Sequence, residues 1–291
     1  MADGRAAVER GADWVTGRLE EFTPWAGSGG RGREDRSRLK PFGELAMVFA
    51  YLTAWAARAT PPWPELDRVL DRWRTFLVDR CSDERYLRQA RADLDDGPYL
   101  MQPYAWLRST GVRLPAAEDV VTELWRSGRG PTSIGQVHSF AKGGYVRGEP
   151  RWDDFCRRQV LAPTWSTGRI AREAYRVTHA VFYATDLGDR RTGLTSAERR
   201  SVAAVVERVA DHARRTRHWD RLLEAVIATR SLGSSVEPFA RARADVERAR
   251  SADGAVPRAA DAGGGGFAVC YHATLVGLLD GVQHEVLGRA A

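Results

Sequence analysis

Apolar residues recur at helical spacing along nearly the whole chain, and short polar, glycine or proline segments separate these stretches. Long alternating runs of valine, isoleucine and threonine, or Asn-Gly turns, would indicate strands, and the sequence contains neither. We therefore expect an all-α protein with about eleven or twelve helices.

The expected helices are of two kinds. Residues 43–57 and 267–280 are apolar on nearly all sides, which is typical of helices that are buried on every face. Residues 66–78, 196–214 and 238–250 are amphipathic, with one face suited to solvent. Two layers, an inner ring of buried helices and an outer ring of amphipathic ones, would produce this mixture. The predicted architecture is an α/α toroid, with an α-solenoid as the alternative.

The composition shows no break that would divide the chain into separate domains. We expect one toroid domain over residues 1–291, with flexible loops near 26–37, 127–149 and 251–266, where glycine and polar residues are concentrated. The sequence Thr-Ser-Ala-Glu from Thr195 onward has the form of a capping box and predicts that a helix begins there.

The number of cysteines and the hydropathy of the sequence indicate in which cellular compartment the protein is expected. The three cysteines are scattered, which argues against a disulfide scaffold and fits a reducing cytoplasm. No stretch approaches ~18 consecutive apolar residues, so we expect no membrane span. The first residues lack the apolar core of a secretory signal. The expected location is the cytoplasm.

The chain is basic, with a formal net charge of +6. Acidic residues are interleaved with the arginines, a pattern typical of solvated helix faces with pairs three or four residues apart. A nucleic-acid surface would need basic residues clustered on one face. We therefore expect a small-molecule substrate and no nucleic acid or membrane partner, and we leave a homodimer open.

The most informative stretch has the sequence THAVFYATDLG. On a helix, four of its residues share one face, because they lie three, four and seven positions from the first: His179, Phe182, Tyr183 and Asp186. A histidine and an aspartate on an otherwise aromatic and apolar face are costly to bury without a partner.

A second stretch, FAVCYHAT, opens the apolar helix near the end of the chain. It places Cys270, Tyr271, His272 and Thr274 in the first turns, directly after a run of four glycines. Helix amino termini carry free N–H groups and positive potential, so ligands and catalytic groups collect there.

If these two helices are neighbours, His179, Asp186 and His272 could converge. Two imidazoles and one carboxylate are a usual catalytic zinc set with an open fourth position. The same groups could form a metal-free acid and base, with Asp186 orienting a partner. They could also be satisfied members of a polar core network. The spacing leaves all three alternatives open.

These motifs resemble those of a known family. The pattern T-H-x-x-F-Y-x-T-D-x-G from Thr178 to Gly188, the pattern Y-H-x-T from Tyr271 to Thr274 and the segment 100–111 are similar to an uncharacterised actinobacterial family, known only as a domain of unknown function. The resemblance covers most of the chain and implies a setting in natural-product biosynthesis.

Two more distant resemblances point to enzymes that are α/α toroids. The segment Tyr271–Thr274 is similar to the Phe-Tyr-His-Thr motif of protein prenyltransferase β-subunits, which implies zinc binding by His272. The Asp-x-Cys ligand pair of that family has no counterpart here. The segment Asp93–Asp96 resembles the D-x-D-D motif of class II terpene cyclases, which implies that Asp95 donates a proton. Adjacent carboxyls such as Asp95 and Asp96 suit that role, because each raises the pKa of the other.

The expected function follows from these features. No nucleotide-binding fingerprint is present, so we expect a non-redox enzyme that acts on a largely apolar small molecule in a central cavity. It would be a cyclase, isomerase, lyase or hydrolase of bacterial specialised metabolism, with a divalent metal such as zinc as an optional cofactor. The alternative is a non-catalytic helical binding or scaffold protein. The expected catalytic residues are His179, Asp186, His272 and Tyr183, and the expected substrate-binding residues are Phe182, Tyr271, Thr274, Cys270, Asp95 and Asp96.

Overall fold

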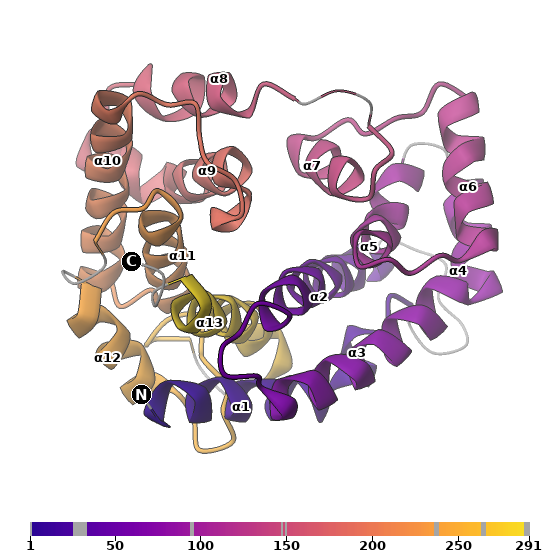
Figure 1. The fold of residues 1–291 in the computed structure, drawn as a ribbon, viewed down its shortest axis with the longest axis horizontal. Coiled ribbons are helices and arrows are strands. Elements are labelled where there is room, and N and C mark those ends of the chain that lie inside the picture. The colour runs from indigo at the N-terminus through magenta and orange to yellow at the C-terminus, as the bar shows by residue number, and fades with distance from the viewer. Residues whose placement is uncertain are drawn as a thin grey trace. The chain divides into compact units, whose positions relative to one another are not determined.

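The helical periodicity of the sequence has its counterpart in a computed structural model that describes residues 2–25, 34–93, 96–146, 148, 150–235, 239–262 and 266–287. These described residues contain thirteen α-helices and no strand, which confirms the predicted all-α class (Figure 1). The α-helices are α1 Ala2–Thr16, α2 Glu34–Ala56, α3 Pro64–Ser82, α4 Glu84–Ala92, α5 Gly97–Ser109, α6 Pro115–Arg126, α7 Ile134–Lys142, α8 Trp152–Cys156, α9 Thr167–Thr185, α10 Ser196–Arg215, α11 Trp219–Ser231, α12 Ala240–Ala249 and α13 Phe267–Leu287.

The helices form two compact units, one of residues 12–149 and one of residues 1–11 together with 150–291. Each unit buries an apolar core of its own. The single α/α toroid over residues 1–291, like the α-solenoid, stays a prediction.

In the unit of residues 12–149, α2 packs against α5, and α5 packs against α6 and α7. The apolar character of α2 on all sides predicts a buried helix, and its side chains Phe42, Phe49 and Trp55 are almost fully buried. The ring of Tyr51 on α2 lies 5.5 Å from the ring of Trp106 on α5, measured between centroids. Aromatic packing between α2 and α5 thus forms the centre of this core.

Two of the predicted loops of this unit are partly helical, so the prediction was wrong there. In the stretch 127–149, α7 begins at a capping box formed by Ser133 and Gln136. The glycines on both sides suggested a loop, although the pattern Ser-x-x-Gln was present. In the stretch 26–37, α2 already begins at Glu34, and residues 26–33 lie outside the described residues.

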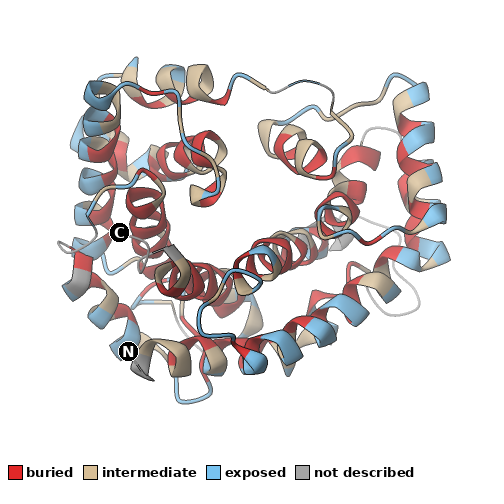
Figure 2. Ribbon diagram, viewed as in Figure 1, coloured by how far each residue is buried: buried red, intermediate tan, exposed pale blue. Residues whose placement is uncertain are grey.

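In the unit of residues 1–11 and 150–291, α11 is the central helix and packs against α9, α10 and α13. Residues 222–230 of α11 are all buried, whereas α10 has one buried and one exposed face, as its amphipathic pattern predicts (Figure 2). The predicted capping box at Thr195 is confirmed, because the Thr195 and Glu198 side chains each accept a hydrogen bond from the other's backbone N–H.

Residues 251–262 contain no helix, as expected, but they are packed and not loose. Ala255 and Val256 are buried. The backbone N–H of Val256 donates to Oγ1 of Thr274 at 2.9 Å, and the N–H of Trp219 donates to the carbonyl oxygen of Arg258 at 2.8 Å. The expectation of a flexible loop was therefore wrong for these residues, while residues 263–265 lie outside the described part of the chain.

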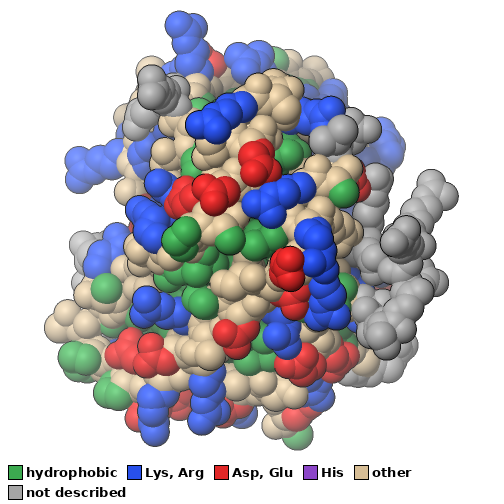
Figure 3. Space-filling model, turned by 90° about the vertical axis from the view of Figure 1, so that its right-hand side faces the viewer, with side chains coloured by type: hydrophobic (Ala, Val, Ile, Leu, Met, Phe, Trp, Pro, Cys, Tyr) green, Lys and Arg blue, Asp and Glu red, His purple; other side chains and the backbone are tan. Residues whose placement is uncertain are grey.

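Across the described residues, no helix is long and apolar enough to cross a membrane. Positive and negative side chains are interspersed on the face that Figure 3 displays. Pairs such as Arg88 with Glu84, which lie four residues apart in the chain and 2.9 Å apart in space, are of the kind that the interleaved charges of the sequence predict.

Candidate functional site

α9 holds His179 in a half-buried position with its ring fixed by Tyr175, one turn earlier. The Nδ1 atom of His179 lies 3.0 Å from the backbone carbonyl oxygen of Tyr175, and the two rings stack with their centroids 3.6 Å apart. A carbonyl oxygen only accepts hydrogen bonds, so Nδ1 carries the proton and Nε2 of the neutral ring is the acceptor.

The aromatic face predicted around His179 is present on α9. The ring centroid of His179 lies 5.3 Å from that of Phe182 and 6.1 Å from that of Tyr183. Tyr183 also contacts Trp152 of α8, with the ring centroids 5.8 Å apart. Burial, followed by the charges of Tyr175 and Glu224, raises the pKa of Tyr183 far above its ordinary value, so this hydroxyl is neutral.

Asp186 does not continue this face, which corrects the predicted grouping. Its backbone is left-handed, with φ 49° and ψ 49°, and its N–H donates to the carbonyl oxygen of Phe182 as α9 ends. A spacing of seven residues places two side chains on one face only while the helix continues.

The predicted zinc set is also not assembled. In the part of the chain that the structure describes, no group of three or more His, Cys, Asp or Glu side chains is placed to hold a metal ion. His179, Asp186 and His272, all of which are described, therefore do not form a metal-binding cluster.

A residue that sequence reasoning did not single out, Glu224 of α11, contacts one predicted histidine, His272, and the residue that precedes the other, Thr178. Its side chain is 6% exposed. Oε1 of Glu224 lies 3.4 Å from Nε2 of His272 on α13, and Oε2 accepts a 2.8 Å hydrogen bond from Oγ1 of Thr178 on α9. Because Thr178 directly precedes His179, one carboxylate connects the parts of α9 and α13 that carry the predicted site.

Glu224 is ionised despite its burial. Burial by itself raises the pKa of a carboxyl, but the charge of His179, the contact with His272 and the hydrogen bond from Thr178 together lower the pKa of Glu224 to about 2. At neutral pH the site is thus a buried negative charge with two imidazoles beside it.

A sequence signal for Glu224 existed. It is the single acidic residue within the run LLEAVIA, which forms the most buried part of α11. An ionisable group in a fully apolar stretch needs a polar partner, and such groups are candidates for functional sites.

The other predicted residues of α13 differ in their surroundings. The ring of Tyr271 lies 6.3 Å from the ring of His272 and stacks on Phe267, with the centroids 5.1 Å apart. Cys270 is buried. Thr274 is buried and accepts the hydrogen bond from Val256, so its hydroxyl holds the segment 251–262 in place.

The segment Asp93–Asp96 belongs to the other unit, where it follows α4 in the chain and precedes α5. Asp95 lies outside the described residues. The backbone N–H of Asp96 donates to Oδ1 of Asp93 at 3.0 Å, and Gly97 begins α5. Pro98 is in the first turn of that helix, where its missing N–H costs nothing.

Fold and site together define an all-helical protein with a buried carboxylate near two imidazoles. The chain belongs to the family described as "Domain of unknown function (DUF6895)", whose family model matches residues 8–282. This confirms the resemblance to a family without an assigned function. No curated protein and no solved structure matches the chain.

Proposed function

We propose that the chain is a non-redox enzyme that transfers protons by general acid–base catalysis at His179, Glu224 and His272. The observation that carries the proposal is the buried, ionised carboxylate of Glu224 beside two imidazoles. A buried charge is costly, and imidazole is the side chain best suited to proton transfer near neutral pH. Their combination is typical of catalytic sites.

The two imidazoles would act through different ring atoms. Nε2 of His272 faces Glu224, so Nδ1 of the neutral ring is the atom that accepts a proton, and Glu224 stabilises the imidazolium that results. In His179 the accepting atom is Nε2, because Nδ1 faces the carbonyl of Tyr175. One imidazole would remove a proton from the substrate, and the other, protonated, would return one elsewhere. Such transfer suits isomerisation, elimination or cyclisation.

The side chains around the imidazoles suit a small and largely apolar substrate. Tyr175 is 62% exposed, and the rings of Phe182, Tyr183 and Tyr271 lie close to one or the other imidazole. Aromatic rings contribute apolar area with defined geometry for binding such molecules.

The proposal also includes a place in actinobacterial natural-product biosynthesis and a homodimer. Zinc is not included, because the described side chains provide no set of ligands for it.

Proton exchange with solvent tests the proposal without knowledge of the substrate. The protein is incubated in D2O with a small-molecule extract of the organism that encodes it, and mass spectrometry identifies compounds that gain deuterium or change retention. We expect His272→Gln and His179→Gln to lower this exchange by at least about 100-fold, the usual contribution of a general acid or base. His212→Gln on α10, outside the site, is the matched control and should leave the exchange unchanged.

Two results would contradict the proposal. One is exchange that is equally fast in His272→Gln, His179→Gln and wild type. The other is an extract in which no compound exchanges, together with NMR signals of the His179 and His272 rings that do not respond to Glu224→Gln. The second result would favour the alternative of a helical binding protein without chemistry.

A further inference from the structure

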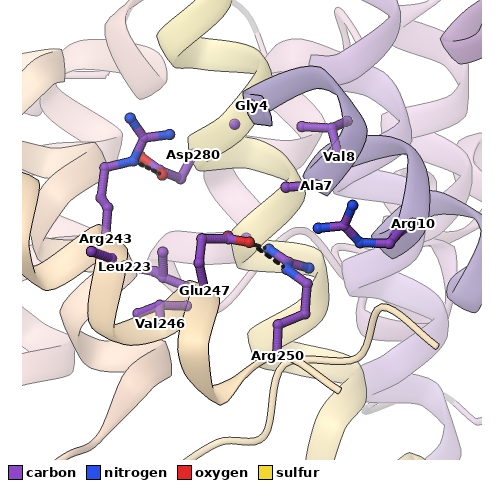
Figure 4. A pocket seen from close by; sticks show the side chains of 13 residues that line it. Gly4, Ala7, Val8, Arg10, Leu223, Arg243, Val246, Glu247, Arg250 and Asp280 are labelled. Carbon is purple, nitrogen blue, oxygen red and sulfur yellow. Dashed lines mark hydrogen bonds and ion pairs between the residues drawn. The ribbon is translucent and has the colours of Figure 1, made fainter. Parts of the chain in front are cut away.

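A cavity that shares no lining residue with the acid–base site lies within the unit of residues 1–11 and 150–291 (Figure 4). Its volume is about 280 Å³, and residues of α1, α11, α12 and α13 line it. This is slightly below the roughly 300–1,000 Å³ that pockets for drug-sized ligands occupy. The cavity therefore has room for a small molecule.

Two glycines of α13, Gly277 and Gly281, line the cavity and differ in their surroundings. A Cβ atom on Gly281 would overlap Cγ2 of Val8, so α1 and α13 are in close contact there. One turn earlier, a Cβ atom on Gly277 would be 3.7 Å from Nη2 of Arg250, in ordinary van der Waals contact. α1 and α13 are thus tightly packed at Gly281, whereas the position of Gly277 has room for a methyl group.

At one end of the cavity the carboxylate of Asp280 pairs with two arginines, Arg243 in the lining and Arg230 behind it. Asp280 is buried, its Oδ1 accepts from Nη2 of Arg230 at 2.9 Å, and its Oδ2 accepts from Nε of Arg243 at 2.9 Å. One carboxylate therefore serves two guanidinium groups. The pKa of the nearby His284 is lowered from its ordinary value, first by burial and then by the positive charges of Arg243 and Arg230.

Arg10 adds a further positive charge at the opposite wall. Among the described residues no carboxylate pairs with Arg10, which is exposed, and its guanidinium points into the cavity (Figure 4). Arg250 is already neutralised, because its Nη2 lies 2.8 Å from Oε1 of Glu247. The rest of the lining includes apolar side chains, among them Val246 and Leu223.

We propose that this cavity binds a small organic anion, a carboxylate or a phosphate monoester with a short aliphatic part. The oxyanion would pair with Arg10, and Arg243, which shares the carboxylate of Asp280 with Arg230, would add positive potential. The aliphatic part would cover Leu223, Val246 and Val8, which line the cavity. This ligand site does not depend on the proposed catalytic function.

Calorimetric titration of the full chain at low salt tests the site with four probes: hexanoate, hexyl phosphate, inorganic phosphate and hexylamine. We expect one of the two hexyl anions to bind, and the comparison between them identifies the preferred head group. Inorganic phosphate should bind at least about tenfold more weakly, because it lacks the buried methylene groups. Hexylamine should not bind.

Three variants make the test specific. Arg10→Gln removes the unpaired charge, and Ala244→Glu adds a negative charge at an exposed position that lines the cavity. Each should weaken binding of the hexyl anion about tenfold or more, the usual effect of losing one charged hydrogen-bond partner. The matched control is Arg241→Gln, which replaces an exposed arginine of α12 that does not line the cavity. It should leave the binding of the hexyl anion unchanged. Absence of binding by both hexyl anions, or equal binding by Arg10→Gln and Arg241→Gln, would overturn the proposal.

Discussion

At the scale of single residues, the charge of Glu224 depends on its neighbours from two other helices. Burial opposes ionisation, and the lowered pKa exists only because His179, His272 and Thr178 lie around the carboxylate in the folded chain. In the unfolded chain this carboxyl returns to its ordinary pKa. The difference between the two states makes the free energy of unfolding depend on pH.

We expect Glu224→Gln to remove part of the acid sensitivity of the protein. A carboxyl whose pKa falls from 4.5 when unfolded to about 2 when folded stabilises the protein above pH 4.5, and this contribution is lost as the pH falls towards 2. Urea unfolding followed by circular dichroism between these pH values should show a steeper loss for wild type than for Glu224→Gln. The exposed Glu207→Gln on α10 should follow wild type, and parallel curves for wild type and Glu224→Gln would refute this.

At the scale of secondary-structure elements, the packing of α13 is decided by where its glycines lie. Gly281 allows α1 to approach, because any side chain there would meet Val8. Gly277 is in the same helix but has room for a methyl group. Two residues of the same type thus have opposite consequences when they are replaced.

We expect Gly281→Ala to lower the free energy of unfolding by about 1–3 kcal/mol, the usual cost of overpacking. Gly277→Ala should raise it by about 0.5–1 kcal/mol, because alanine is the better helix former. Urea denaturation of both variants measures this difference. Val8→Ala should restore part of the stability lost in Gly281→Ala, since it removes the overlapping methyl group. Equal stability of the two alanine variants would argue against the close contact of α1 and α13.

At the scale of the whole molecule, the chain has two compact units with separate cores. Trp106 is buried in the core of residues 12–149, with its ring 5.5 Å from the rings of Tyr51 and His138. Trp219 is buried in the other core. If each core is cooperative by itself, damage to one should affect mainly its own unit.

We expect Trp106→Ala to cost about 3–5 kcal/mol, the usual loss for a buried tryptophan. Hydrogen exchange followed by mass spectrometry should then show faster exchange mainly in residues 12–149. Trp219→Ala, the matched variant, should act mainly on residues 1–11 and 150–291. Equal acceleration in both units by either variant would indicate a single cooperative structure.

Much of the helical pattern could be predicted from the sequence. The amphipathic helix over 196–214 and its capping box at Thr195 are present, because helix signals are local. The wrong predictions came from conflicting local signals. The glycines around α7 suggested a loop although its capping box is present. The small side chains of residues 251–262 suggested a flexible loop, although buried contacts hold this segment in place. Local rules do not state how such conflicts are resolved.

The sequence by itself determined the all-α class, the buried faces and the placement of His179 and His272 on two apolar helices, since these depend on spacing along one chain segment. Only the tertiary structure decided which carboxylate stands beside them. Asp186 was expected, but a left-handed residue ends α9 at that position, and Glu224 lies beside His272 because α11 packs between α9 and α13. Neighbours from different helices are chosen by packing, which no spacing within one helix encodes.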